Sequence, residues 1–180
     1  IIRSLSETVA PKLVGADMQL LKTLITDVFP GISQEERKFD DLVAAIREEV
    51  KARKFEMSEV WVSKIIQIYQ IAELHHGFMV VGPTGTGKTS SWEVLLAALG
   101  RMGGGGIGHV IDPKSMSKDD LYGKMDNTTR EWTDGVFTKI LRRIIDETKT
   151  CLEKDIKTHW IVFDGDVDPV WVENLNSVLD

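Results

Sequence analysis

Residues 77–89 read GFMVVGPTGTGKT, an apolar run followed by a glycine-rich loop that ends in lysine and threonine. A short apolar run bounded by glycines is typical of a strand buried on both faces, as in a parallel sheet. The loop matches the pattern G-x-x-x-x-G-K-[ST] at every fixed position. After it, residues 90–99 carry apolar side chains at helical spacing. This succession of strand, loop and helix predicts an α/β fold with a phosphate-binding loop.

The loop has the chemistry that a chain of phosphates requires. Its glycines let the backbone curl and point several N–H groups into one concavity, and the following helix adds the positive end of its dipole. Lys88 can reach the β- and γ-phosphates, and the Thr89 hydroxyl can bind magnesium. We therefore predict a site for ATP (or ADP) and Mg²⁺, with these nucleotide-binding residues: Gly82, Pro83, Thr84, Gly85, Thr86, Gly87, Lys88 and Thr89.

Magnesium in such a site also needs an acidic ligand at the end of a neighbouring strand. Residues 160–163 read WIVF and are followed by Asp164, so Thr89 and Asp164 are the predicted metal ligands. Hydrolytic members of this class place a glutamate next, where it activates the attacking water. Residue 165 is instead a glycine, which has no side chain to act as a general base. We therefore assign no catalytic residue.

From the sequence alone, ATP hydrolysis that uses Asp166 is still possible. It is the next residue but one after Asp164 and could reach a water, although its side chain is shorter than that of glutamate. The alternative is that Asp166 and Asp168 shape the turn before the helix that begins at Pro169. Three hypotheses follow: a nucleotide held without turnover, a slow ATPase that uses Asp166, and an interaction module with a vestigial loop that binds no nucleotide.

The first 76 residues differ in character from the rest of the chain. Apolar residues at helical spacing predict helices over 18–29, over 35–54 and from Ser58 onward. We therefore expect a helical lead-in at residues 1–76 and a nucleotide-binding α/β domain at residues 77–180.

Strands and helices alternate after the phosphate loop, which indicates a parallel sheet wrapped by helices. The pattern predicts strands over 109–111 and 160–163, helices over 136–146 and 169–179, and a loop over 103–106. In the run Glu131-Trp132-Thr133-Asp134-Gly135 we expect Thr133 or Asp134 to cap the helix that follows. Four tryptophans on apolar stripes are expected in the core: Trp61, Trp92, Trp160 and Trp171.

Composition and charge exclude several classes of function. The 180 residues carry a net charge of −6, which argues against a broad nucleic-acid surface and so against direct nucleic-acid binding. The single cysteine, Cys151, cannot form an internal disulfide and favours a reducing compartment. No apolar run approaches the ~18 residues of a membrane span, and the N-terminus lacks the features of a signal peptide. We expect a cytoplasmic protein without a membrane anchor.

Four stretches of the sequence resemble the dynein heavy chain family, from residue 18 to nearly the end of the chain. They are TDVFPG at 26–31; the phosphate loop; HVIDPK at 109–114 with LYG at 121–123 and TREWTDG at 129–135; and WIVFDGDVD at 160–168 with WVENLNS at 171–177. The resemblance is strongest to the second AAA+ module of the motor ring in cytoplasmic-type dyneins. The runs WTDG at 132–135 and FDGDVD at 163–168 are far more specific than a phosphate loop alone.

The resemblance implies a fold and a function. The fold is a P-loop NTPase (AAA+) three-layer parallel sheet with helices on both faces. The family comprises minus-end-directed microtubule motors, in which this module binds ATP without turnover. The implied partners are the neighbouring AAA+ modules, microtubules, dynein intermediate and light chains, and a second heavy chain. Because the chain begins at Ile1 and stops at Asp180, we expect a piece of a longer protein that ends before the lid subdomain.

Overall fold

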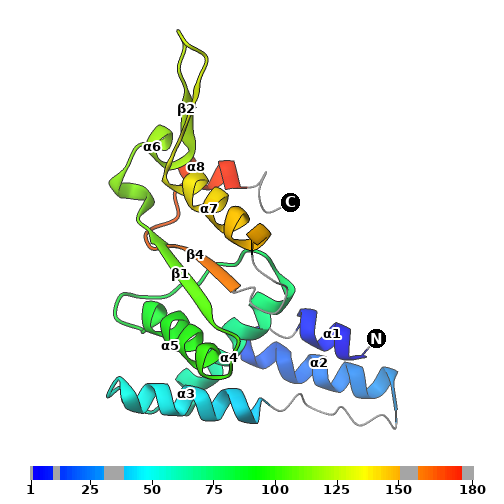
Figure 1. Cartoon of the computed structure of the whole chain (residues 1–180). Helices are drawn as coiled ribbons and strands as arrows, with labels where there is room; N and C mark the ends of the chain where they lie inside the picture. Colours follow the sequence, from blue (N-terminus) through cyan, green and yellow to red (C-terminus); the bar gives the residue numbers. More distant parts are fainter. Residues whose placement is uncertain (1, 10–12, 31–38, 151–157, 176–180) are drawn as a thin grey trace. The chain divides into compact units, whose positions relative to one another are not determined.

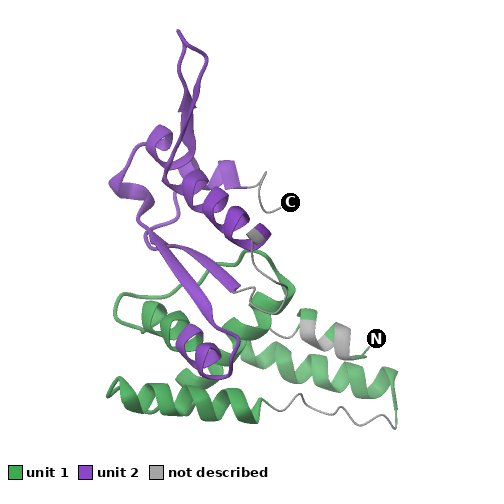
Figure 2. Ribbon diagram, in the orientation of Figure 1, with its two compact units in different colours: residues 1–95 green, residues 96–180 purple. Residues whose placement is uncertain are grey.

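The computed structural model describes residues 2–9, 13–30, 39–150 and 158–175. The chain divides into two compact units, Ile1–Leu95 and Leu96–Asp180 (Figure 2), and each is described by itself. Figure 1 shows the elements in chain order. They are α1 (Ile2–Val9), α2 (Gly15–Val28), α3 (Asp40–Ala52), α4 (Glu59–Leu74), α5 (Lys88–Arg101), β1 (Gly106–Ile111), η2 (Pro113–Ser115), α6 (Lys118–Tyr122), β2 (Gly123–Met125), β3 (Trp132–Asp134), α7 (Val136–Thr150), β4 (Thr158–Phe163), α8 (Pro169–Val172) and η4 (Glu173–Leu175).

Helices build the first unit, as the spacing of its apolar residues predicts. Helices α2, α3 and α4 lie at the three predicted positions, and α1 is an additional helix that the sequence pattern did not reveal. The largest fully buried side chains of the unit come from α3, α4 and the middle of α5: Ile46, Val50, Ile65, Val94 and Leu95. The helix that follows the phosphate loop therefore contributes to the core of the first unit.

The prediction of a buried strand before the phosphate loop is wrong. Residues 77–83 form neither strand nor helix, and Met79 and Val81 expose 71% and 86% of their surface. A strand obtains its backbone hydrogen bonds from a neighbouring strand, and the described part of the first unit contains no strand that could supply them. Apolar composition alone was therefore not enough to make this segment a strand.

A parallel pair of strands forms the centre of the second unit. β1 pairs with β4 in a register that sets Ile111 opposite Phe163, and the chain between them includes α6 and α7. Both predicted strands are confirmed, each beginning earlier than the apolar run suggested. This parallel pairing through helices confirms the predicted α/β class.

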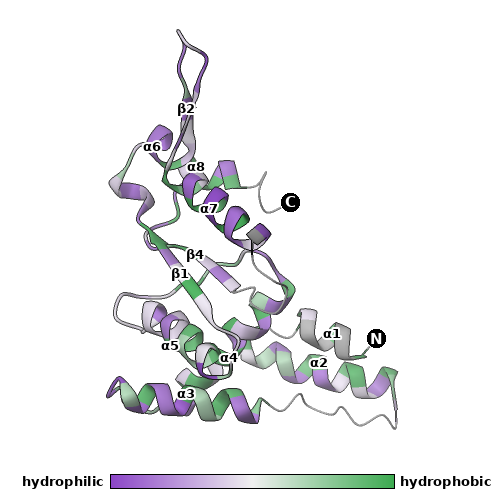
Figure 3. Cartoon of the chain, in the orientation of Figure 1, coloured by the Kyte–Doolittle hydropathy of each residue, from purple (hydrophilic) through white to green (hydrophobic). Residues whose placement is uncertain are grey.

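Aromatic side chains pack on one another beside this sheet. Phe163 of β4 lies 5.6 Å from Phe137 and is stacked on Trp171 at 5.1 Å between ring centroids. Trp171 is buried as predicted, whereas Trp61, Trp92 and Trp160 are half-buried. Figure 3 shows α7 banded in apolar and polar colours, as expected for an amphipathic helix.

A β-hairpin replaces the predicted helix cap before α7. Thr133 and Asp134 belong to β3, which pairs antiparallel with β2, so neither caps the helix. Gly123 has a φ of +112° and Gly135 lies against the backbone of Leu121, where an added Cβ would come within 2.5 Å of backbone atoms. Two glycines at these points allow a hairpin in a stretch whose polar residues suggested a helix start.

The C-terminal helix is shorter than predicted within the described residues. α8 covers Pro169–Val172 and continues as a single 3-10 turn over Glu173–Leu175; the predicted remainder, residues 176–179, lies outside the described residues. No helix in the described ranges is long and apolar enough to cross a membrane.

Candidate functional site

The phosphate loop has the backbone conformation that its glycines predict. Gly85 and Gly87 have φ angles of +82° and +81°, which non-glycine residues rarely adopt. Helix α5 begins at Lys88, directly after the second of these glycines. The N-terminal N–H groups of α5 therefore open at the loop, the arrangement by which helices bind anions.

The ammonium group of Lys88 is folded over the loop that precedes it. It donates to the carbonyl oxygens of Gly82 and Pro83 at 2.9 and 2.8 Å. Thr86 also donates to the Pro83 carbonyl, at 2.8 Å. The positive charge therefore lies within the glycine-rich turn, where a phosphate group would neutralise it, so the residues present fit a nucleotide phosphate chain.

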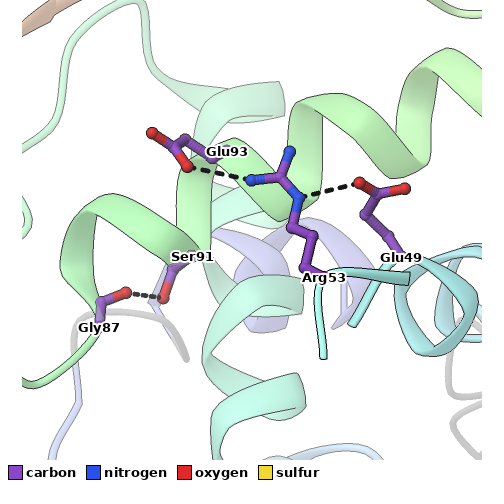
Figure 4. Close-up of polar contacts among 5 residues, drawn as sticks. All are labelled: Glu49, Arg53, Gly87, Ser91 and Glu93. Carbon is purple, nitrogen blue, oxygen red and sulfur yellow. Dashed lines mark hydrogen bonds and ion pairs between the residues drawn. The ribbon is translucent and has the colours of Figure 1, made fainter. Parts of the chain in front are cut away.

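Two residues behind the loop were not recognised as part of the site from the sequence. Ser91 is 5% exposed, and its hydroxyl donates to the carbonyl of Gly87 at 2.7 Å, as Figure 4 shows. The indole N–H of Trp61 donates to the same hydroxyl, also at 2.7 Å. The polar atom of an indole on an otherwise apolar stripe was the available signal, because a buried Trp N–H needs an acceptor.

An arginine also connects the lead-in to α5. Arg53 binds Glu49 at 2.9 Å and Glu93 at 3.0 Å (Figure 4). The hydrogen bond that Arg53 donates to Glu49 is the main cause that raises the pKa of Arg53, and the contact with Glu93 adds to it. Arg53 therefore links the end of α3 to Glu93 of α5, the helix that follows the phosphate loop.

The predicted acidic ligand lies at the carboxyl end of the parallel pair in the second unit. Asp164 follows β4 directly, and its N–H donates to the carbonyl of Ile111 at 2.9 Å. Its side chain is exposed. Asp112 follows β1 at the same edge, but its carboxylate accepts the N–H of Lys114 at 3.0 Å and caps a short 3-10 turn. Of these two acids, Asp164 is the one whose carboxylate is not used to cap a turn.

Asp166, the alternative base, is held in an ion pair. Its carboxylate lies 2.8 Å from the ammonium group of Lys114, and both side chains are largely exposed. The hydrogen bond from Lys114 is the main cause that lowers the pKa of Asp166. Asp168 caps α8, accepting the N–H of Val170 at 2.9 Å, which confirms the turn-shaping hypothesis for Asp168. A lowered pKa makes Asp166 a weaker base.

The backbone conformation at position 165 does not require a glycine. Its φ lies outside the left-handed region, and an added Cβ would meet Pro113 and Asp112 only at ordinary contact distances of 3.6 and 3.7 Å. A side chain at this position is therefore sterically acceptable, and the glycine's main consequence is that the site lacks a carboxylate there.

The predicted metal ligands belong to different units, Thr89 to the first and Asp164 to the second. Both side chains are exposed. A hydroxyl and a carboxylate are oxygen ligands of the kind that Mg²⁺ prefers. Among the described residues no group of three or more His, Cys, Asp or Glu side chains that could hold a metal ion occurs.

The glycine-rich loop and the helix that follows it are those of a P-loop domain, and the family matches give its class as AAA. Residues 77–180 match the family described as "AAA domain (dynein-related subfamily)", and residues 1–89 match the "Hydrolytic ATP binding site of dynein motor region". The second match ends at Thr89, before the acidic strand end.

The comparisons with individual proteins are equally specific. The chain is 52% identical to a cytoplasmic dynein heavy chain of Fusarium vanettenii and 49% identical to that of Dictyostelium discoideum. It is 39% identical to cytoplasmic dynein 2 heavy chain 1 of Chlamydomonas reinhardtii. Each alignment covers 100% of this chain and 4% of the relative. The chain belongs to the dynein heavy chain family and carries nucleotide-binding AAA sequence, and it spans about 4% of the length of these relatives.

Proposed function

We propose that this chain is an ATP-binding AAA module of a microtubule motor that works in the cytoplasm. In this proposal it holds Mg-ATP as a structural or regulatory nucleotide, with little or no hydrolysis at this site. The family match and the names of the relatives support the motor, and the phosphate loop supports the nucleotide. The proposal places the module second in the motor ring, as the resemblance in the sequence suggests.

The nucleotide contacts follow from the chemistry of each residue. The loop Gly82–Thr89 binds the phosphates through its backbone N–H groups and the ammonium of Lys88. Thr89 and Asp164 supply oxygen ligands to magnesium, which when bound neutralises phosphate charge. The helical lead-in at 1–76 and the α/β domain at 77–180 are retained as the proposed domains; the AAA match also begins at residue 77.

The observation that carries the proposal is the absence of a usable base after Asp164. Position 165 would accept a side chain but is a glycine. The next carboxylate, Asp166, is paired with Lys114 at 2.8 Å, and its pKa is lowered by that contact. A water beside the γ-phosphate would have neither group to accept its proton efficiently.

The proposed partners belong to the full-length protein. They are the adjoining AAA modules of the same chain, microtubules, dynein intermediate and light chains, and a second heavy chain. A nucleotide that is bound without turnover would stabilise the module by mass action.

Retention of labelled nucleotide tests this function. The full-length heavy chain, with the phosphate-loop lysines of its other modules replaced, is loaded with α-³²P-labelled Mg-ATP and freed of unbound label. Bound nucleotide is then followed by thin-layer chromatography for an hour. We expect the label to stay bound as ATP, and Lys88→Ala to abolish retention.

The other outcomes distinguish the two alternatives. Conversion of the bound label to ADP would overturn the proposal, and loss of that conversion in Asp166→Asn would identify Asp166 as the base. No retained label in the unaltered protein would instead support a vestigial loop. Gly165→Glu is the matched gain-of-function variant, because it adds a carboxylate at a position that has room for one.

A further inference from the structure

A chain of two hydrogen bonds connects the lead-in helix α4 to the last peptide of the phosphate loop. Trp61 donates its indole N–H to the hydroxyl of Ser91 at 2.7 Å, and Ser91 donates to the carbonyl oxygen of Gly87 at 2.7 Å. The backbone N–H of Ser91 donates to the same carbonyl at 2.9 Å. The Gly87 carbonyl is therefore fixed by two donors, one of which is oriented by Trp61.

Fixing that carbonyl also fixes the direction of the next N–H group. In a trans peptide, the C=O of one residue and the N–H of the next point in opposite directions, and the chain has no cis peptide in its described part. With the Gly87 oxygen turned into α5, the N–H of Lys88 points away from the helix. This direction is the one from which helix N-termini bind phosphate.

Trp61 reaches this position because the loop has no side chain there. A Cβ on Gly87 would lie 3.4 Å from the indole nitrogen of Trp61, so the ring packs directly on the loop backbone. Phe55 supports the ring edge-on at 5.8 Å between centroids. Ser91 is 5% exposed, so water competes little for the hydrogen bonds of its hydroxyl.

We infer that Trp61 is a positioning residue for nucleotide phosphate, acting through Ser91 and the peptide between Gly87 and Lys88. The inference rests on the nucleotide binding proposed above and deepens it. It makes the lead-in part of the nucleotide site, because the indole comes from α4 and the loop alone does not supply this contact.

The ion pair between Arg53 and Glu93 provides a matched contrast. It also joins the lead-in to α5, at 3.0 Å, but in Figure 4 it lies apart from the Ser91–Gly87 contact, and neither side chain bonds the loop backbone. Replacing one member of this ion pair removes a contact between the lead-in and α5, and it leaves both hydrogen bonds to the Gly87 carbonyl in place. It therefore separates general support of α5 from orientation of the loop.

The test measures both the affinity and the number of sites for Mg-ATP in the full-length heavy chain with its other phosphate loops disabled. The variants are Trp61→Phe, which keeps an aromatic ring but removes the donor, Ser91→Ala, their combination, and the control Glu93→Gln. We expect Trp61→Phe and Ser91→Ala each to weaken binding roughly three- to tenfold at full stoichiometry. The double variant should lose less than the product of the two, because both act on one path. Glu93→Gln should bind as the unaltered protein does.

Each of the other possible results contradicts either the role inferred for Trp61 or the proposed nucleotide binding. Unchanged affinity in both Trp61→Phe and Ser91→Ala, with normal binding by the unaltered protein, would refute the inference and leave the nucleotide site standing. If Trp61→Phe has fewer sites but unchanged affinity, Trp61 only supports folding. If Trp61→Phe does not fold, the affinity of Ser91→Ala for Mg-ATP tests the same path. No Mg-ATP binding by the unaltered protein would refute the proposed function itself.

Discussion

Adding one methyl group at Gly85 or at Gly15 should change stability by different amounts, although both sites lie in the first unit and both have open space. An added Cβ meets no atom within 4 Å at either position, so steric overlap contributes to neither variant. Alanine also reduces the freedom of the unfolded chain equally in both, which stabilises each by about 0.4–1 kcal/mol. The remaining difference is the backbone: Gly85 has a φ of +82°, and Gly15 is the first residue of α2.

The strain of an L-residue in the left-handed region is about 1–2 kcal/mol, so Gly85→Ala should be less stable than Gly15→Ala by that amount. For a chain of this size, 1 kcal/mol corresponds to about 2–4 °C in Tm. Thermal unfolding followed by far-UV circular dichroism should therefore separate the variants by roughly 2–8 °C, with Gly15→Ala at or above the unaltered protein. Equal Tm values would refute the reasoning, since they would mean that alanine at position 85 causes no strain from a positive φ.

Three further predictions concern the second unit. Leu121→Ala should destabilise by about 2–5 kcal/mol in urea unfolding, because this side chain is 1% exposed; Leu20→Ala, at a site 64% exposed, is the control and should change little. Gly135→Ala should cost about 1–3 kcal/mol, because its Cβ would come within 2.5 Å of the Leu121 backbone, and a neutral result by the same measurement would contradict that close approach. In Lys114→Met, Asp166 loses the contact that lowers its pKa. The stability that this ion pair adds to the folded protein is present above the unfolded-state pKa of Asp and is lost as the pH falls through the folded-state pKa. The small Tm deficit of Lys114→Met at pH 7 should therefore disappear as the pH falls below about 4, and a deficit that persists in acid would exclude the ion pair as its cause.

Polar contacts over long sequence separations were beyond the reach of the sequence. Lys114 and Asp166 are 52 residues apart, and Trp61 and Ser91 are 30 apart. Nothing in the local pattern around Asp166 distinguishes a base in reach of water from a carboxylate held by an ammonium group. Only the pairing of β1 with β4, which sets the two strand ends side by side, brings Lys114 to Asp166.

By itself the sequence determined whatever depends on neighbours along the chain. Helical spacing located α2 to α5 and α7, the glycines and lysine of residues 82–89 predicted the phosphate loop, and Gly165 predicted a site without a glutamate base. The tertiary structure decided whatever depends on a distant partner. Residues 78–81 are apolar enough for a strand, but the described residues of their unit include no strand to pair with. β2 and β3 form because Gly123 and Gly135 let two backbones approach. The physical reason is that periodicity and turn chemistry act within a few residues, whereas strand pairing and buried hydrogen bonds require a particular second segment in space.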